Sequence, residues 1–276
     1  MSTLPEDFER IAGSKVEAWV RSGLVDTFKS LDITDPEAFW NKCDSGEAVG
    51  RAPVRLLCIS GSEPCMAVVR KYRRGGLFGK LVSDTYFIGA RPHDELVVTA
   101  HAERSGAPVP RVLAAVKFRK AIGYGGFLVT EEIARSEQLP TRWKAAKSRS
   151  EQCSLIRATA RAVRQLHDTG IYHADLQLKN ILISEDGNAH IIDCDRARVV
   201  DPSDVFSRVR NLLRFLRSAR KAARKGLVLS DRDIKLFLAF YTHENIALRD
   251  EISRYRILPV LYKLKWALSD VMSLSQ

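Results

Sequence analysis

The chain has 276 residues, of which 45% are apolar, and this is enough to bury one or two ordinary globular cores. It contains no run of about 18 apolar residues, and its N-terminus lacks the basic start and apolar stretch of a secretory signal. The five cysteines are odd in number and scattered, without a CxxC pair that would suggest zinc or a redox couple. These features predict a soluble globular protein of a reducing cytoplasm.

Basic residues outnumber acidic ones, 44 Lys and Arg against 33 Asp and Glu, which gives a formal net charge of +11. A positive field of this kind raises the local concentration of negative ligands. We therefore expect an anionic partner. Composition alone leaves nucleic acid, phosphate-bearing metabolites and an anionic membrane surface as candidates.

The periodicity of apolar residues changes near residue 133. Before this point, turn residues separate short β-like runs, and one helical stretch lies around Asp94–Ser105. The predicted strands are chiefly Val54–Ser60, Met66–Tyr72 and Gly126–Glu132. The first 45 residues carry no recognisable motif, so residues 1–132 are expected to form a small β-rich lobe with an unassigned N-terminal extension.

Residues 133–276 have a mostly helical pattern. Apolar residues at spacings of three and four predict an amphipathic helix over 155–166, which Gly170 ends. Two short strands, Ile181–Ile183 and Ala189–Asp193, follow, and the Asp-Gly within residues 184–188 predicts a tight hairpin between them. From Val205 onward the chain reads as helix. The expected fold class is α+β, a small β-rich lobe followed by a larger α-rich one.

The segment between the predicted helix and hairpin carries the strongest chemical signal. It contains the pattern H-x-D-x-x-x-x-N, formed by His173, Asp175 and Asn180. In a phosphoryl-transfer site the Asp accepts the proton of the attacking hydroxyl, and the Asn holds a magnesium ion. Asp193, eighteen residues after Asp175, ends the second hairpin strand, where a carboxylate is suited to a second magnesium contact.

A purely structural interpretation of these residues also exists. Asp175 and Asn180 are common turn formers, and Asp193 could cap the end of a strand. Each segment alone is compatible with that interpretation. Their combination, with a hairpin of suitable length between them and an amphipathic helix before them, favours catalysis.

Several segments resemble the 3-deoxy-D-manno-octulosonic acid (Kdo) kinases of the lipopolysaccharide kinase family, within the protein-kinase-like superfamily. The similarity extends over roughly residues 50–220, in matching order along the chain. The resemblance implies a bilobal protein-kinase-like fold that uses ATP and Mg²⁺. The segments that carry it are Val68–Lys80, which includes Tyr-Arg-Arg-Gly-Gly-Leu, Gly106–Arg111, His173–Asn180, Asp193–Arg198 and Asn211–Ser218.

The chain departs from regulated protein kinases at two points of the motif. Ala174 replaces the usual Arg before the catalytic Asp, and Cys194-Asp195 replaces the usual Phe-Gly after the second Asp. Without that Arg, control by a phosphorylated activation loop is not expected. Both departures favour a small-molecule acceptor over a protein.

The resemblance implies a phosphate-contacting cation on the strand that ends at Tyr72, either Arg70 or Lys71. Strand alternation places these two side chains on opposite faces, so only one of them can face the nucleotide. The family pattern favours Arg70, whereas ordinary kinase chemistry favours Lys71. Glu95, on the predicted helix, matches the acid that pairs with this cation and orients it. Solvated surface positions are the alternative for all three.

Two further nucleotide contacts are weaker predictions. Gly50 lies where kinases have a glycine-rich phosphate loop, although Pro53 removes one backbone N–H there. The strand ending at residue 133 resembles the hinge between kinase lobes, where backbone groups of Glu131–Ile133 would contact adenine. By composition alone it is only another strand.

A cationic stripe is predicted on the helix that follows Val205. Between Val205 and Leu229 there are eight basic residues and no acidic one, with basic residues recurring every three or four positions. A solvated face is the default interpretation. Guanidinium groups also bind carboxylates and phosphates in a bidentate way, so the stripe is a candidate site for an anionic acceptor or membrane surface. The candidate residues for this anion site are Arg214 and Arg217 of the stripe, together with Arg73, Arg74, Arg196 and Arg198 from other segments.

The leading hypothesis is therefore an ATP-dependent kinase that phosphorylates a hydroxyl of Kdo on lipid A, at the cytoplasmic face of a Gram-negative inner membrane. A heptose kinase or another small-molecule phosphotransferase would use the same machinery. A non-catalytic kinase-like binding protein is the alternative from another class. Nucleic acid is not an expected partner, because aromatic residues are not interleaved with the basic ones for stacking on bases.

Overall fold

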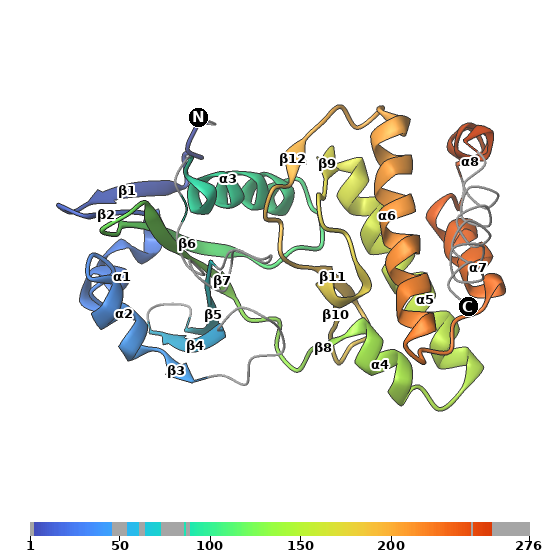
Figure 1. Cartoon of the computed structure of the whole chain (residues 1–276), viewed down its shortest axis with the longest axis horizontal. Helices are drawn as coiled ribbons and strands as arrows, with labels where there is room; N and C mark the ends of the chain where they lie inside the picture. The colour runs from blue at the N-terminus through green and yellow to red at the C-terminus, as the bar shows by residue number, and fades with distance from the viewer. Residues whose placement is uncertain are drawn as a thin grey trace, which may run out of the picture. The chain divides into compact units, whose positions relative to one another are not determined.

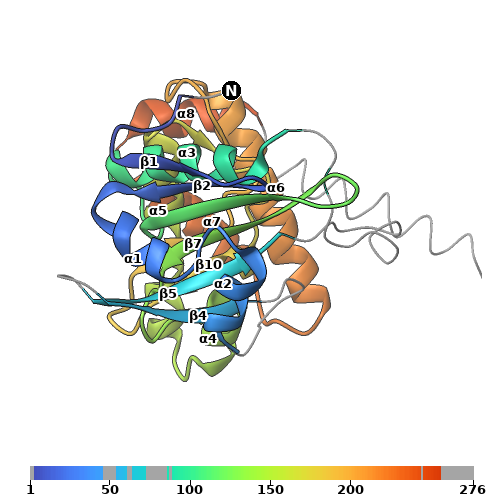
Figure 2. The same ribbon diagram turned by 90° about the vertical axis from the view of Figure 1, so that its left-hand side faces the viewer.

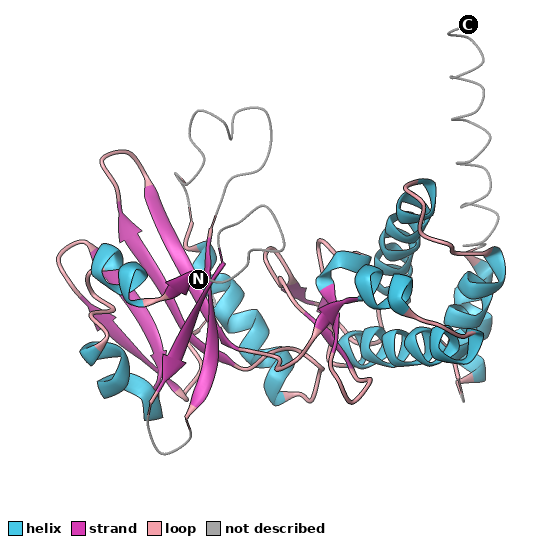
Figure 3. Cartoon of the chain, turned by 90° about the horizontal axis from the view of Figure 1, so that it is seen from below, coloured by secondary structure: helices cyan, strands magenta, loops and turns pink. Residues whose placement is uncertain are grey.

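The computed structural model describes residues 3–45, 54–60, 64–72, 86, 89–243 and 245–255 (Figure 1). The chain divides into two compact units: unit 1 is Met1–Arg104 with Val109–Ile133, and unit 2 is Ser105–Pro108 with Ala134–Gln276. Strands dominate unit 1 and helices dominate unit 2 (Figure 3). The fold is therefore of the α+β class, as the sequence predicts.

Unit 1 is built on an antiparallel sheet. Its described strands follow the order β1-β2-β6-β7-β5-β4-β3, so β6 and β7 lie in the middle. The strands are β1 (Phe8–Ala12), β2 (Val16–Arg21), β3 (Asp44–Ser45), β4 (Val54–Ile59), β5 (Cys65–Lys71), β6 (Val112–Arg119) and β7 (Tyr124–Glu131).

Helices cover both faces of this sheet (Figures 1 and 2). One face packs Ala67 and Val69 of β5 against Phe28 of α1 (Val25–Ser30) and Phe39 of α2 (Pro36–Lys42). The other face packs Leu128 and its neighbours against α3 (Arg91–Arg104). Because strand side chains alternate, the two buried faces also fix which side of β5 each cation occupies.

Residues 3–45 belong to the sheet and to the helices that cover it, and do not form a separate extension. Strands β1 and β2 pair with each other, and β2 pairs with β6. Arg21, at the end of β2, donates to the Val112 carbonyl at 2.9 Å and forms ion pairs with Asp7 at 2.9 Å and Glu103 at 2.7 Å. These contacts tie the N-terminal strands to the end of α3, the helix that carries Glu95.

A glycine allows the start of α3 to lie directly on the sheet. A Cβ atom at Gly126 of β7 would come within 2.4 Å of the Pro92 ring and 2.6 Å of the Val116 carbonyl. Such contacts are far shorter than any real carbon contact, so a side chain here would push α3 away. The position of α3 against β7 therefore depends on this residue.

Unit 2 is mainly helical, and its longest described helices are α5 and α6. Ser148 caps α5 by accepting a hydrogen bond from the Glu151 N–H at 3.1 Å. Gly170, with φ of +74°, follows the helix end, and a Cβ there would lie 2.5 Å from the Val200 carbonyl. The helices are α4 (Leu139–Ala145), α5 (Arg149–Asp168), α6 (Val205–Arg224), α7 (Asp231–Tyr241) and α8 (Ile246–Arg254).

Short strands hold the connections of unit 2 together. Strand β9 (Ile171–Tyr172) pairs with β12 (Arg198–Val199), and β10 (Ile181–Ile183) pairs with both β11 (Ala189–Ile191) and β8 (Glu137–Gln138). The β10–β11 hairpin is the one that the Asp-Gly sequence predicts. None of the described helices is both long enough and apolar enough to cross a membrane.

Strand β6 was not among the expected strands. Residues 112–116 are all fully buried, because β2 and β7 flank the strand and helices cover both faces. Such a strand shows no alternation of apolar and polar residues, which is the signal on which strand prediction relies. Its burial, rather than a weak β-propensity, explains why the sequence pattern missed it.

Candidate active site

The predicted catalytic loop lies between β9 and β10 and ends in a short 3-10 helix, Leu178–Asn180. Asn180 is buried, and its Nδ2 donates to the Asp175 carbonyl at 2.8 Å. The Asn180 carbonyl in turn accepts the Ile192 N–H at 3.0 Å. These two bonds link the Asp175 backbone, the Asn180 amide and the segment that precedes Asp193, which lies eighteen residues after Asp175 in the sequence.

The His173 ring makes a second link between the same segments. The Asp175 N–H donates to Nδ1 at 3.1 Å, and Nε2 lies 3.1 Å from the Ile192 carbonyl. Since Nδ1 accepts, the proton must reside on Nε2, and the ring is neutral. Burial, the largest cause, lowers the pKa of His173 below its ordinary value. A charged ring would lose the bond that orients the Asp175 backbone.

Asn211 of α6 clamps the backbone of His173. Its Oδ1 accepts the His173 N–H at 2.9 Å, and its Nδ2 donates to the His173 carbonyl at 3.0 Å. The side chain has no exposed surface. A buried amide that satisfies both backbone groups of one residue fixes that residue as a neighbouring strand would.

The network continues into α5 and α7. His167 Nε2 lies 3.2 Å from Asn211 Oδ1, and His167 Nδ1 lies 2.8 Å from the Tyr241 hydroxyl. Because Oδ1 only accepts, Nε2 donates and Nδ1 accepts from Tyr241. Burial chiefly, together with the nearby Arg208 guanidinium, lowers the pKa of His167 to about 3, and burial raises the pKa of Tyr241 to about 12.

One stripe of α6 faces the catalytic loop. Asn211, Arg214 and Ser218 are three and four residues apart, the spacing that puts helical residues on one face. Arg214 Nη1 lies 3.6 Å from Asp175 Oδ1, and the Ser218 hydroxyl accepts the Leu178 N–H at 2.9 Å. Successive turns of one helix therefore contact successive parts of the loop.

The Asp175 carboxylate is accessible and lies among donors. Its side chain is 38% exposed. Gln177 Nε2 donates to Oδ1, and Lys179 Nζ lies 3.8 Å from Oδ2. With Arg214, two cations flank the group, which suits an acceptor that carries negative charge of its own.

The loop fits a divalent cation. With Nδ2 bound to the Asp175 carbonyl, Asn180 Oδ1 accepts no hydrogen bond from any described residue. Asp193 is half-buried and adopts φ of +66°, an unusual backbone for a residue with a side chain. Mg²⁺ typically takes one or two protein oxygens and completes its shell with water and phosphate. No group of three His, Cys, Asp or Glu ligands occurs in the described ranges, so an all-protein metal cage is not what these residues provide.

Unit 1 brings Arg70 and Glu95 together. Arg70 Nη2 lies 2.6 Å and 2.7 Å from the two Glu95 oxygens, and the Tyr72 hydroxyl also donates to Glu95. The Glu95 side chain is 1% exposed and that of Arg70 22%. A buried carboxylate is costly unless it is paired, so this acid holds the guanidinium in place.

Lys71 points to the opposite face. Its Nζ lies 5.5 Å from the centre of the Trp40 ring, on the side of α2. Between the two candidate cations, therefore, Arg70 shares a face with Glu95 and Lys71 does not. Gly50, Arg73 and Arg74 lie outside the described residues.

The predicted hinge occupies the end of β7. The Glu131 N–H donates to the Arg111 carbonyl at 2.8 Å, and the Glu132 N–H donates to the Met66 carbonyl at 2.8 Å. The Ile133 N–H, by contrast, has no acceptor in the described part of the chain. Of these three N–H groups, that of Ile133 is the one left for a ligand.

Within the described residues, Arg196, Arg198 and Arg217 of the expected anion site form no ion pair with Asp175, whereas Arg214 does. Arg217 is exposed, and its Nε donates to the Leu213 carbonyl at 3.2 Å. Arg198 lies over the Tyr172 ring, 4.7 Å from its centre. Arg196 is exposed on a turn with φ of +60°. Among the arginines predicted to bind the acceptor, Arg214 is the one shown in contact with Asp175.

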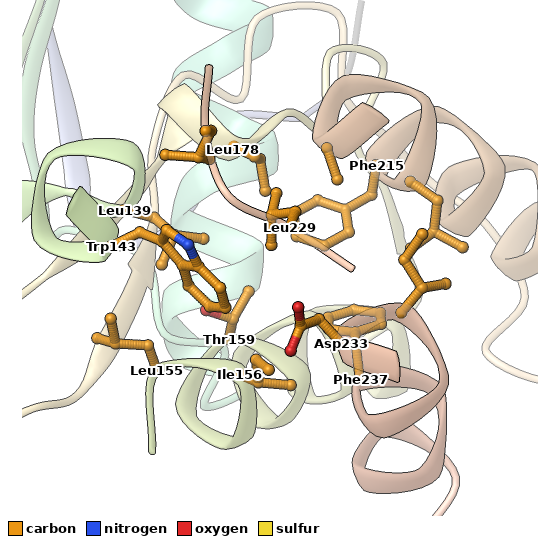
Figure 4. A pocket seen from close by; sticks show the side chains of 14 residues that line it. Leu139, Trp143, Leu155, Ile156, Thr159, Leu178, Phe215, Leu229, Asp233 and Phe237 are labelled. Atoms are coloured by element: carbon orange, nitrogen blue, oxygen red, sulfur yellow. The ribbon is translucent and has the colours of Figure 1, made fainter. Parts of the chain in front are cut away.

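An apolar cavity lies elsewhere in unit 2 (Figure 4). It has about 460 Å³ of free space, part of it open to solvent, and its walls are almost entirely apolar. Leu178 contributes from the catalytic loop, Phe215 from α6, and Trp143 and Phe237 from the neighbouring helices. Such walls suit neither phosphate nor sugar, so this cavity is not a candidate site for either.

Comparison with known proteins places this loop in a family. The profile of the Lipopolysaccharide kinase (Kdo/WaaP) family matches residues 37–241. The chain belongs to this family. The resemblance noted in the sequence is thereby confirmed, and the match includes the catalytic loop, Asp193 and the helix that carries Asn211.

Several curated relatives of this chain carry the same name. The chain is 31% identical over 216 residues to the 3-deoxy-D-manno-octulosonic acid kinase of Vibrio cholerae, covering 76% of this chain and 88% of the relative. It is 30% identical over 214 residues to the enzyme of that name from Actinobacillus succinogenes, covering 74% and 87%. The Haemophilus influenzae enzyme of that name is 31% identical over 198 residues, covering 68% and 80%.

Sequence analysis did not assign a role to Asn211. The available signal was an amide in line with the apolar face of an amphipathic helix, next to Leu212 and one turn from Phe215. Polar residues at such positions need an internal partner. Gln177 and Ser218 carried no comparable signal, because polar residues at exposed positions are common.

Substitution of Asn211 should show how much its hydrogen bonds contribute to the free energy of unfolding. Asn211→Leu leaves the buried His173 N–H and carbonyl and the His167 Nε2–H without partners, so we expect a loss of about 3 kcal/mol or more in the free energy of unfolding. Asn211→Asp keeps the acceptor but places a second carboxylate oxygen against the His173 carbonyl in a buried site, so it should also be clearly destabilised. Urea unfolding curves would measure both. Equal stability of the Leu variant and the wild type would show that the clamp contributes nothing.

The two buried histidines should make the fold acid-sensitive. Both have a lowered pKa when folded, so the unfolded chain binds more protons and stability falls as pH drops below the ordinary histidine pKa of about 6.5. The loss continues toward about pH 3 for His167. In urea unfolding at stepped pH, His167→Gln should reduce the slope by up to about 1.4 kcal/mol per pH unit. An unchanged slope would mean that His167 is not the titrating group.

Proposed function

We propose that this protein transfers the γ-phosphoryl group of ATP to a hydroxyl of Kdo on lipid A, in assembly of the lipopolysaccharide inner core. One observation carries the proposal. A loop presents Asp175 and Asn180, and hydrogen bonds of His173 and Asn180 with the backbone of Ile192 hold this loop next to Asp193. The relatives named 3-deoxy-D-manno-octulosonic acid kinase support the acceptor.

Asp175 would act as the base. As the acceptor oxygen attacks the γ-phosphorus, its proton passes to the Asp175 carboxylate, and the bond from the γ-phosphorus to the bridging oxygen of ADP breaks. Gln177 donates to one carboxylate oxygen and so orients the other toward the acceptor. His173 and Asn211 hold the backbone from which this carboxylate projects.

Asn180 Oδ1 and the Asp193 carboxylate would hold Mg²⁺. When bound, the ion would neutralise part of the phosphate charge that the reaction has to overcome. The hydrogen bond from Asn180 to the Asp175 carbonyl keeps the amide oxygen turned away from the backbone, as a ligand must be.

The nucleotide would also be held by residues of unit 1. Arg70 is our candidate for the phosphate contact, because Glu95 and Tyr72 orient it, whereas Lys71 lies over Trp40. Backbone groups of Glu131 and Ile133 would receive adenine. In this proposal unit 1 is the nucleotide-binding lobe and unit 2 the catalytic lobe of a protein-kinase-like fold.

The acceptor carboxylate would bind Arg214 and Lys179. Both cations lie within 4 Å of an Asp175 oxygen, at 3.6 Å and 3.8 Å, so an anionic sugar bound to them would bring a hydroxyl close to the base. Arg73, Arg74, Arg196 and Arg217 are left as additional contacts to the lipid-linked phosphates. The expected location is the cytoplasmic face of the inner membrane, where a lipid-linked acceptor is made.

The catalytic assignment is tested with isolated Kdo–lipid A and radiolabelled ATP. Asp175→Asn should lower kcat by about 10²-fold to 10⁴-fold, because the variant cannot accept the proton. Asp193→Asn should raise the Mg²⁺ concentration needed for half-maximal rate. Unchanged activity of Asp175→Asn would remove it as the base. Nucleotide binding without any transfer by the wild type would instead favour a non-catalytic binding protein.

The acceptor site has its own test. Arg214→Gln should raise the KM for Kdo–lipid A by about tenfold, because a bond between charged groups is lost, while the KM for ATP stays constant. Arg161→Gln, at an exposed position of α5, is the matched loss of charge and should change neither constant. If both variants behave alike, net charge rather than a specific contact governs acceptor binding.

A further inference from the structure

Arginine and aromatic side chains alternate along one end of unit 2. Arg198 of β12 and Arg210 of α6 both lie over the Tyr172 ring, at 4.7 Å and 5.7 Å from its centre. Arg210 also lies 5.6 Å from the centre of the Phe206 ring, which is 6.4 Å from the ring of Tyr255. Strands β9 and β12, the start of α6 and α8 meet at this end of the unit (Figure 1). We call these five residues, with Val199, the arginine–aromatic patch.

The apolar members of the patch are exposed. Phe206 is 54% exposed, Val199 53% and Tyr255 40%. Single exposed apolar residues are ordinary, but the rings of Phe206 and Tyr255 lie beside each other and beside the Arg210 guanidinium, and Val199 follows Arg198 in β12. Removal of such apolar surface from water is favourable, so burial of the patch against a partner would lower the free energy of the complex.

The cations of the patch are available for a partner. Neither Arg198 nor Arg210 has a carboxylate within ion-pair distance in the ranges that the structure describes. The nearby acids are engaged: Asp201 accepts from Ser203, and Asp204 caps α6 by accepting from the Ser207 N–H. Other arginines of this region, such as Arg208, are paired with acids.

The sequence beyond the patch has the same character. The chain leaves Tyr255 with 21 further residues, mostly apolar, that include Trp266, Tyr262 and two lysines. Aromatic and basic residues beside apolar ones are the composition of segments that lie at the interface of a bilayer.

We propose that the arginine–aromatic patch is the surface by which the enzyme docks on an anionic lipid bilayer. Arginine heads would pair with lipid phosphates while Val199, Phe206 and Tyr255 enter the headgroup region. The idea goes beyond the proposed function and draws on it in one respect, that a lipid-linked acceptor requires the enzyme to work at a membrane.

A bilayer fits this surface better than single-stranded nucleic acid. Bases bind by stacking on free aromatic faces. Two guanidinium groups lie over the Tyr172 ring, and a third contact of the same kind involves Phe206. Arginines therefore already occupy faces of the Tyr172 and Phe206 rings, which are then not free to stack on bases.

The test is cosedimentation of the full-length protein with vesicles of phosphatidylethanolamine and phosphatidylglycerol, compared with pure phosphatidylcholine. Wild type should bind the anionic vesicles preferentially. Arg198→Gln with Arg210→Gln should weaken binding at low salt by about fivefold for each arginine. Phe206→Ser with Tyr255→Ser should weaken it on the order of tenfold and, unlike the arginine change, by a similar factor in high salt.

The matched control removes two arginines elsewhere. Arg224 ends α6, about 21 Å along the helix from Arg210, and Arg232 lies in the first turn of α7. The Arg224→Gln, Arg232→Gln protein has the same net charge as the patch variant and should bind as the wild type does. Equal loss in both double variants would overturn the patch in favour of net charge. Tighter binding to a poly-dT oligonucleotide than to vesicles would overturn the choice of partner.

Docking and catalysis can fail separately. Phe206→Ser with Tyr255→Ser should phosphorylate detergent-solubilised Kdo–lipid A at the wild-type rate, since neither residue contacts the catalytic loop. Unfolding curves of this variant that match those of the wild type exclude a folding defect. If the wild type binds vesicles but transfers no phosphate, the proposed function is rejected and the docking surface stands. If the wild type is active but does not bind anionic vesicles, the docking surface is rejected and the proposed function stands.

Discussion

The buried amide of Asn211 is the constraint on which the candidate active site depends. It satisfies both backbone groups of His173, and the ring of His173 then fixes the Asp175 backbone and the Ile192 carbonyl. Asn211 and His173 have no exposed surface, so loss of the bonds between them would leave buried polar atoms at full cost. The loop is thus held by buried hydrogen bonds rather than by weak surface contacts. This explains how a segment without long secondary structure can present a carboxylate in one position.

Unit 1 uses the same principle for a different group. Glu95 is buried where a lone carboxylate would be unstable, and Arg70 and Tyr72 together satisfy it. The arrangement also depends on parts of the chain remote from the pair: Gly126 lets α3 approach β7, and Arg21 ties the end of that helix to the N-terminal strands. A surface pair would tolerate drift of α3, whereas this one does not.

The sequence predicted what local patterns encode. The catalytic loop, the β10–β11 hairpin and the amphipathic helices follow from spacing and turn residues, and the two-faced alternation of β5 correctly separated Arg70 from Lys71. It missed β6, which is buried on both faces and shows no alternation, and it missed the β1–β2 hairpin, which joins the sheet through the pairing of β2 with the distant β6. Asn211 was beyond reach for a related reason: its partners are 38 and 44 residues away.

Helix α6 shows why a cationic stripe read from sequence is not one site. Because the helix has 3.6 residues per turn, Asn211, Arg214 and Ser218 share the face that contacts the catalytic loop. Arg210 and Phe206 belong instead to the arginine–aromatic patch. An arginine at one position is drawn to a carboxylate and at the other to an aromatic ring, so the neighbours decide its chemistry. A single helix would then link the proposed acceptor contact to the proposed lipid contact, and an enzyme acting on a membrane-bound sugar would need both at a fixed separation.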